Sequence, residues 1–269
     1  MTRFICRQCG TEFPESDEPP QGCPICEDER QYVRWTGQAW TTGDELAAGH
    51  GPSWEKELGL LGLTVKPDFP IGQRALFVPT PEGLVMWDCV ALITPEITER
   101  LRAIGGLRAI AISHPHYYTT VGSWSDAFGG VPVYLHADDR EWVMRPHPSI
   151  RHWEGDTLAL ADGITLVRCG GHFEGGTVLH WRDGAEGRGA LLVGDIAQVT
   201  MDRRHVSFMR SYPNNIPLGP GPVRRIGAAV APLSFDRIYG AFRNRNVASG
   251  AREAFDRSLE RYLQAIAED

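Results

Sequence analysis

Two histidines one residue apart give the strongest local sign of chemistry in the central part of the chain. His114 and His116 lie in the stretch Ser113-His114-Pro115-His116-Tyr117, directly after the apolar run 107–112. That run predicts a buried strand, so both imidazoles leave one strand end and face one point. Histidine is the commonest metal ligand, and loops on a rigid scaffold commonly present such ligands. From this motif alone, a turn-capping histidine beside a packed one remains the alternative.

A third histidine and two aspartates also lie at strand ends. His172 lies in the Gly-rich loop CGGHFEGG between two apolar stretches, and Asp195 follows the next apolar stretch as Gly194-Asp195. The histidine pair, His172 and Asp195 thus all occupy strand ends or strand-to-strand loops. Asp88 ends an earlier strand, where its carboxylate can hydrogen-bond a metal-ligating histidine. A turn or helix-cap role fits Asp88 equally well.

Four cysteines near the amino terminus have the spacing of a second metal site. Cys6-x2-Cys9 and Cys23-x2-Cys26 are two CxxC turns, which together can place four thiolates around one ion. The segment resembles zinc ribbons and the rubredoxin-like tail of rubrerythrins. We expect zinc here, with iron as the alternative, since both suit four thiolates. So short a segment buries little apolar surface, so metal binding should supply most of its folding free energy. A redox-active CxxC or a disulfide pair is the competing interpretation.

Composition restricts the class of protein. The chain has 269 residues, 42% of them hydrophobic, which is enough for one large core and a small appendage. The net charge of -7 disfavours a nucleic-acid partner. No apolar run approaches the ~20 residues that span a bilayer, and the first residues lack a signal-peptide pattern, so we expect a cytoplasmic protein without a membrane partner. The sequence leaves homo-oligomer formation open.

The pattern of apolar runs predicts an α/β (α+β) fold in three parts. Short strands separated by turns begin at Leu58, strands and helices alternate around the two histidines, and antiparallel strands follow from Thr157. The aromatic and Pro-rich stretch 201–222 predicts a substrate-covering flap. The expected parts are a four-cysteine ribbon at 1–36, a linker at 37–57 and the main domain at 58–269.

The order of these motifs resembles the metallo-β-lactamase superfamily, from about Leu58 to the carboxyl terminus. The resemblance implies an αββα sandwich, with His114, His116 and His172 as ligands of the first metal and Asp195 as the carboxylate ligand. It also matches Asp88 to an aspartate that the family carries at an early strand end.

The chain departs from the family pattern at the second metal. Tyr118-Thr119 replaces the family's Asp-His pair, and Ala241 or Phe242 stands where a last histidine is expected. We therefore expect a single divalent ion, zinc or iron, in the main domain.

The resemblance implies a metal-dependent hydrolase of a small ester, thioester, lactone or amide. We expect Asp195 to ligate or to act as the base, with Glu174 as its substitute, and Tyr118 to hydrogen-bond an oxyanion or leaving group. Arg243 falls near the missing last ligand and is expected to hold an anionic group of a small-molecule substrate. Two alternatives remain: a mononuclear non-haem iron oxidoreductase with a rubredoxin-like iron centre, and a non-catalytic binding protein.

Overall fold

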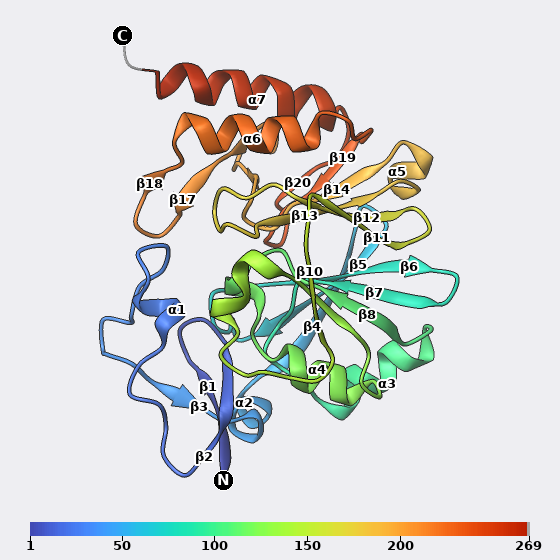
Figure 1. Cartoon of the computed structure of the whole chain (residues 1–269). Coiled ribbons are helices and arrows are strands. Elements are labelled where there is room, and N and C mark those ends of the chain that lie inside the picture. Colours follow the sequence, from blue (N-terminus) through green and yellow to red (C-terminus); the bar gives the residue numbers. More distant parts are fainter. Residues whose placement is uncertain (268–269) are drawn as a thin grey trace. The chain divides into compact units, whose positions relative to one another are not determined.

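The structure is a computed structural model that describes residues 1–267, and the chain folds as two compact units (Figure 1). The first unit contains Met1–Leu135 and Arg140–His152. The second contains His136–Asp139 and the chain from Trp153 onward. Within the described residues, neither unit has a helix long and apolar enough to cross a bilayer.

The four-cysteine segment forms a small three-stranded sheet of order β2-β1-β3 with a one-turn helix. Its elements are β1 (Thr2–Cys6), β2 (Glu12–Ser16), α1 (Pro24–Glu27) and β3 (Trp40–Thr41). Strand β1 pairs antiparallel with both neighbours and ends at Cys6, so the first CxxC turn starts where the sheet stops. Cys23 is the N-cap of α1, and Pro24 occupies the first helical position, where proline's missing N–H costs nothing. The end of β1 therefore positions the first CxxC turn, and the start of α1 positions the second.

The expected boundaries at residues 36 and 57 differ from the structure, because the stretch 37–57 is not a linker. Strand β3 completes the ribbon sheet, and β4 (Gly51–Glu57) is the edge strand of the next sheet. Between them, α2 (Gly43–Gly49) begins with a capping box in which Thr42 and Glu45 each accept the other's backbone N–H. The polar composition of this stretch reflects an edge strand and a surface helix. The ribbon also belongs to the same compact unit as the sheet that follows it.

A seven-stranded mixed sheet forms the rest of the first unit, in the order β10-β9-β8-β7-β6-β5-β4. Besides β4, its strands are β5 (Leu60–Lys66), β6 (Ala75–Thr80), β7 (Gly83–Trp87), β8 (Leu107–Ala111), β9 (Val133–His136) and β10 (Ile150–Trp153). Strands β4 to β7 form an antiparallel meander, and β7, β8 and β9 run parallel. The parallel strands end at one edge of the sheet, which is where such sheets usually place functional loops. His114 and His116 follow β8 at that edge.

Helices connect the parallel strands. They are α3 (Pro95–Ala103), the single turn η1 (Pro115–Tyr117), α4 (Val121–Ala127) and η2 (Ala137–Trp142). Thr94 caps α3 by accepting the N–H of Ile97, an interaction worth about 1 kcal/mol. Trp124 of α4 is fully buried and donates its indole N–H to the carbonyl of Val90 at 2.8 Å. This bond fixes α4, and with it the end of the histidine loop.

The second unit contains a six-stranded sheet of order β11-β12-β13-β14-β19-β20. Its elements are β11 (Thr157–Ala161), β12 (Ile164–Arg168), β13 (Thr177–Trp181), α5 (Gly184–Gly187), β14 (Ala190–Leu192), α6 (Pro220–Val230), β19 (Arg237–Tyr239), β20 (Asn246–Val247) and α7 (Ala251–Ala265). In Figure 1, α6 and α7 lie side by side, and they contact β12 and β19 respectively. Phe255 of α7 is fully buried in this core, where an aromatic side chain contributes roughly 1.5–3 kcal/mol.

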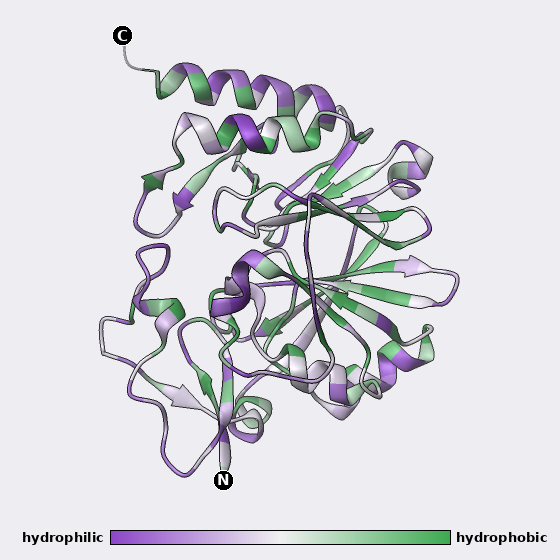
Figure 2. Ribbon diagram, viewed as in Figure 1, coloured by the Kyte–Doolittle hydropathy of each residue, from purple (hydrophilic) through white to green (hydrophobic). Residues whose placement is uncertain are grey.

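The stretch expected as a flap, 201–222, folds as short strands rather than as an irregular loop. Strand β15 (Gln198–Val199) pairs with β16 (Val206–Ser207), and β17 (Met209–Ser211) pairs with β18 (Ile216–Pro217). Phe208 is buried in the core between them. Figure 2 shows hydrophobic colour along most strands of the two large sheets and alternating hydrophilic and hydrophobic colour along α6 and α7, as expected for helices that bury one stripe.

Candidate metal centres

The four cysteines form a compact thiol cluster in the first unit. The Sγ atoms of Cys6 and Cys26 lie 3.7 Å apart, and those of Cys9 and Cys23 lie 3.6 Å apart. Thiolates bound tetrahedrally at about 2.3 Å to one zinc ion would be about 3.8 Å from one another. All four side chains are buried and none forms a disulfide. The geometry therefore fits a single tetrahedral ion and excludes the disulfide interpretation for this structure.

Hydrogen bonds around Cys6 favour its thiolate form. Its Sγ accepts the backbone N–H of Gln8 at 3.4 Å and the amide N–H of Gln38 at 3.3 Å. Bonds from Cys23, Cys26 and Cys9 hold the pKa of Cys6 well below its usual range, whereas burial raises the pKa of Cys9. The four buried thiols cannot all ionise unless a cation offsets their charge.

The loop after β8 positions His114 and His116. Both histidines are buried, and their ring centroids lie 5.1 Å apart. Ser113 Oγ and His114 Nδ1 form a hydrogen bond of 2.8 Å, which sets the ring orientation. The carboxylate of Asp88 accepts the N–H of Ser113 at 2.8 Å, and Asp88 itself has φ of 59°. The strain of that backbone conformation is offset by the bond, so Asp88 supports the histidine loop through Ser113.

The loop between β12 and β13 positions His172. The Nδ1–H of His172 donates to the carbonyl of Met209 at 3.1 Å, so the neutral ring has its lone pair on Nε2. A side chain at Gly176 would place Cβ 2.7 Å from the carbonyl oxygen of Gly170, so only glycine allows the loop to close this tightly. The buried carboxylate of Asp139 accepts the N–H of Gly175 at 2.8 Å. These contacts fix the loop that presents His172.

Asp195 lies three residues after β14 and follows Gly194, whose φ is 50°. Burial raises the pKa of Asp195 to about 7, although a bond of 3.2 Å from Gln198 Nε2 opposes the shift. The hydroxyl of Tyr212 donates to the carbonyl of Asp195 at 3.1 Å and accepts the N–H of Gln198 at 3.3 Å. Tyr212 thus holds both ends of the turn that carries Asp195.

The four residues that the sequence singled out as ligands form one cluster. One ligand atom from each lies within 4.8 Å of all the others, and all four side chains are buried: His114, His116, His172 and Asp195. The limit of 4.8 Å is close to the largest separation, about 4.4 Å, of two ligand atoms that bind one ion at about 2.0–2.2 Å. Within residues 1–267, this cluster and the four cysteines are the two groups of this kind.

The remaining predicted residues lie in different environments. Tyr118 is 4% exposed and lies at the C-cap of η1, two residues after His116. Ala241 is also buried, and neither it nor Phe242 carries a metal-binding atom. Glu174 and Arg243 are exposed, and neither is part of the cluster.

The residues that orient the ligands were not predicted from the sequence. The ring of His114 bonds to Ser113, and the ring of His172 bonds to Met209. Asp195 accepts a bond at its carboxylate from Gln198 and at its carbonyl from Tyr212. Only Ser113, next to His114, carried a signal in the sequence. Met209 acts through its backbone carbonyl, so its side chain gives no indication of the role.

Comparison of sequences gives a relative that matches nearly the whole chain. No family model matches the chain. The uncharacterized protein YmaE of Bacillus subtilis (strain 168) is 44% identical over 269 residues, covering 99% of this chain and 97% of that protein.

Solved structures resemble the chain at low sequence identity. VMB-1 matches with a TM-score of 0.59 and 14% identity, over 80% of this chain and 98% of its own. The metallo-β-lactamase FIM-1 from Pseudomonas aeruginosa, in a mono-zinc form, matches with a TM-score of 0.55 and 14% identity, over 79% and 93%. A B3 metallo-β-lactamase with an active-site glutamic acid gives 0.52 and 17%, over 81% and 89%. These similarities confirm the expected metallo-β-lactamase fold.

Proposed function

We propose that this chain, which belongs to the family of the Bacillus subtilis protein YmaE and has the metallo-β-lactamase fold, is a metal-dependent hydrolase. The proposed substrate is a small ester, thioester, lactone or amide. The proposed ligands of one divalent ion are His114, His116, His172 and Asp195. The observation that carries the proposal is the convergence of these four buried side chains within 4.8 Å.

The donor set suits an ion with catalytic ability. Three imidazoles and one carboxylate bind zinc or iron, and a divalent ion so held supplies Lewis acidity and lowers the pKa of water toward ~7. The Met209 carbonyl holds His172 in the tautomer that a ligand needs. The Ser113 bond does the same for the orientation of His114.

Asp195 is the proposed proton acceptor as well as a ligand. Burial raises the pKa of this carboxyl to about 7, and a bound divalent ion would lower it again, so the proposed acceptor is the carboxylate oxygen that the ion does not take. Glu174, considered as a substitute base, has an exposed side chain, so we assign the proton transfer to Asp195. Tyr212 and Gln198 hold the Asp195 turn and thereby its direction.

Tyr118 and Arg243 are the proposed substrate-binding residues. The hydroxyl of Tyr118 is a neutral donor in a buried position, suited to stabilise an oxyanion or leaving group. The exposed guanidinium of Arg243 is suited to hold a carboxylate of an anionic substrate.

A second candidate function is a mononuclear non-haem iron oxidoreductase with a rubredoxin-like iron centre, for which the N–H···S bonds at Cys6 would have a role. Such bonds tune the potential of iron on thiolates. Colour separates the two candidates, because ferric iron on four thiolates makes a protein red and zinc leaves it colourless. Elemental analysis of the purified protein names the metal.

The hydrolase proposal is tested with a histidine variant and a matched control. The His116→Ala variant should lose the metal of the His/Asp site and the hydrolysis of chromogenic esters, thioesters and lactones. In the control His180→Ala, both should persist, because His180 bonds to the Ser234 carbonyl and is not in the cluster. Full hydrolytic activity in His116→Ala would refute the proposal. A wild-type protein without metal or activity would support the non-catalytic alternative.

A further inference from the structure

A single buried glutamine touches the backbone of both candidate metal sites. Gln73 precedes β6 and is 0% exposed. Its Nε2 donates to the carbonyl of Cys9 at 3.1 Å and to the carbonyl of His116 at 3.0 Å. Cys9 and His116 are 107 positions apart in the chain, and each contributes to a different cluster. One amide group therefore bridges a cysteine turn and the histidine loop.

The chemistry of the amide permits only this orientation. An amide NH2 group has two N–H donors, which match two carbonyl acceptors, whereas the amide oxygen in that place would repel both. The Oε1 atom of Gln73 is buried and has no hydrogen-bond partner among the described residues. A buried acceptor without a partner destabilises the fold. An apolar side chain would avoid that cost, so the two donated bonds are the feature that a glutamine provides here.

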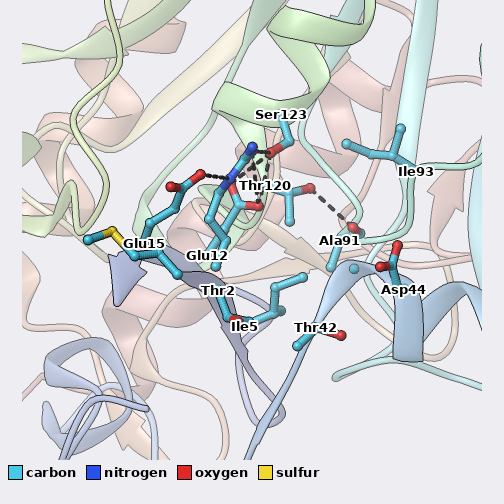
Figure 3. A pocket seen from close by; sticks show the side chains of 13 residues that line it. Thr2, Ile5, Glu12, Glu15, Thr42, Asp44, Ala91, Ile93, Thr120 and Ser123 are labelled. Carbon is cyan, nitrogen blue, oxygen red and sulfur yellow. Dashed lines mark hydrogen bonds and ion pairs between the residues drawn. The ribbon is translucent and has the colours of Figure 1, made fainter. Parts of the chain in front are cut away.

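A second connection runs beside the first. The N–H of Glu12, three residues after Cys9, donates to the carbonyl of Thr119, three residues after His116, at 2.9 Å. The carboxylate of Glu12 accepts a bond from Ser123 at 2.8 Å, and Arg145 lies 2.7 Å from it. Figure 3 shows Glu12 and Ser123 side by side at the edge of a cavity of about 450 Å³. The segment after Cys9 is thus held against the segment after His116.

We propose that Gln73 couples the two metal sites, so that occupation of the four-cysteine site strengthens metal binding at the His/Asp site and the reverse. The inference rests on the proposed function, because it assumes an ion at the His/Asp cluster. An ion on the cysteines fixes the Cys9 turn. Because the Gln73 amide bonds to the carbonyls of both Cys9 and His116, the fixed turn also restricts the backbone of His116. Because binding equilibria are reciprocal, an ion on His116 strengthens the cysteine site by the same factor. Gln73 is a positioning residue, since it bonds to ligand backbones rather than to an ion.

The test measures cobalt affinity at the cysteines, not activity. Co²⁺ on thiolates absorbs strongly, so competition with a chelator gives its dissociation constant at the four-cysteine site. The constant is compared between the full chain and His172→Ala, which disables the His/Asp site without touching Gln73. With Gln73 present, His172→Ala should weaken cobalt binding at the cysteines roughly five- to tenfold. In the Gln73→Leu background the same comparison should give less than a twofold change.

Gln38→Leu is the matched control. Gln38 also donates to the four-cysteine site, through Cys6 Sγ, but the structure gives it no bond to the histidine loop. The effect of His172→Ala should therefore persist in Gln38→Leu. If Gln73→Leu takes up no cobalt at the cysteines, Gln73→Met, which also lacks donors and has an unbranched side chain, replaces it.

The outcomes separate the inference from the proposed function. If His172→Ala weakens cobalt binding at the cysteines equally with and without Gln73, the coupling is overturned and the proposed function stands. The same holds if the parent chain binds two cobalt ions and His172→Ala leaves cobalt binding at the cysteines unchanged. A parent chain that binds only one cobalt ion, at the cysteines, overturns the proposed metal site and the coupling with it.

Discussion

At the scale of single residues, Tyr118 distinguishes this chain from the two-metal pattern that the sequence resembles. A buried hydroxyl two residues after His116 can stabilise charge that develops only in the transition state. We expect Tyr118→Phe to lower kcat and kcat/KM together, on the order of a hundredfold, as for loss of one oxyanion donor. Steady-state kinetics on a substrate identified in the ester and lactone screen measures both constants.

Tyr134→Phe is the control for that measurement. Tyr134 lies on β9, between the buried Val133 and Leu135, and is not assigned to the site. Its substitution should leave kcat unchanged. An unchanged kcat in Tyr118→Phe would remove Tyr118 from the proposed mechanism.

Among the elements, the stretch after β14 forms hydrogen bonds with two of the proposed ligands, through Met209 to His172 and through Tyr212 to Asp195. Tyr212 bonds to both ends of the Asp195 turn, so Tyr212→Phe should weaken metal binding at the His/Asp site roughly tenfold, as loss of a ligand's supporting bond typically does. Tyr262→Phe is the control, because the Tyr262 hydroxyl bonds to the backbone N–H and carbonyl of Leu218. Zinc titration against a chelator measures both variants. Equal affinities in the two variants would mean that Tyr212 does not support Asp195.

The carboxylate of Asp236 accepts the N–H of Gly250 at the start of α7, and its charge should make the stability of the fold depend on pH. Bonds from Arg188 and from the N–H of Gly250 hold the pKa of Asp236 below its usual value. A lowered folded pKa means that the stabilisation is present above the unfolded pKa of ~3.9 and disappears as the pH falls through the folded value. Asp236→Asn should therefore cost about 0.5–1 kcal/mol at pH 7 and progressively less below about pH 4.

Urea unfolding across that pH range measures the difference. Asp256→Asn is the control, since Asp256 forms a surface ion pair with Arg252 of the same helix. A cost for Asp236→Asn that does not change with pH would show that its charge is not involved.

At the scale of the whole molecule, the donor inventory predicts two metal ions per chain. A second ion in the His/Asp site would have Asp195 as its main ligand, because Thr119, Ala241 and Phe242 offer no strong donor. Tyr118 would have to ionise far below its ordinary pKa of ~10 to contribute. Elemental analysis of protein purified without added metal should give a ratio near two. A ratio near three would mean that other residues supply ligands for a third ion.

The residues that carry the chemistry could be predicted from the sequence, because ligand type and spacing are properties of short stretches of chain. The CxxC turns, the pair His114 and His116, and the glycines around His172 were readable from short stretches. The apolar runs also predicted the strands that end at these residues. The sequence failed at 51–57, where the edge strand β4 has the polar composition of a linker.

The residues that orient the ligands and connect the two sites became visible in the folded chain alone. Met209, Tyr212 and Gln73 act through bonds between residues that lie far apart in the chain. Such bonds leave no periodicity, and half of their atoms belong to the backbone, which every residue shares. The bridge from Cys9 to His116 exists because the ribbon packs in the same unit as the first sheet, and no local pattern encodes that packing.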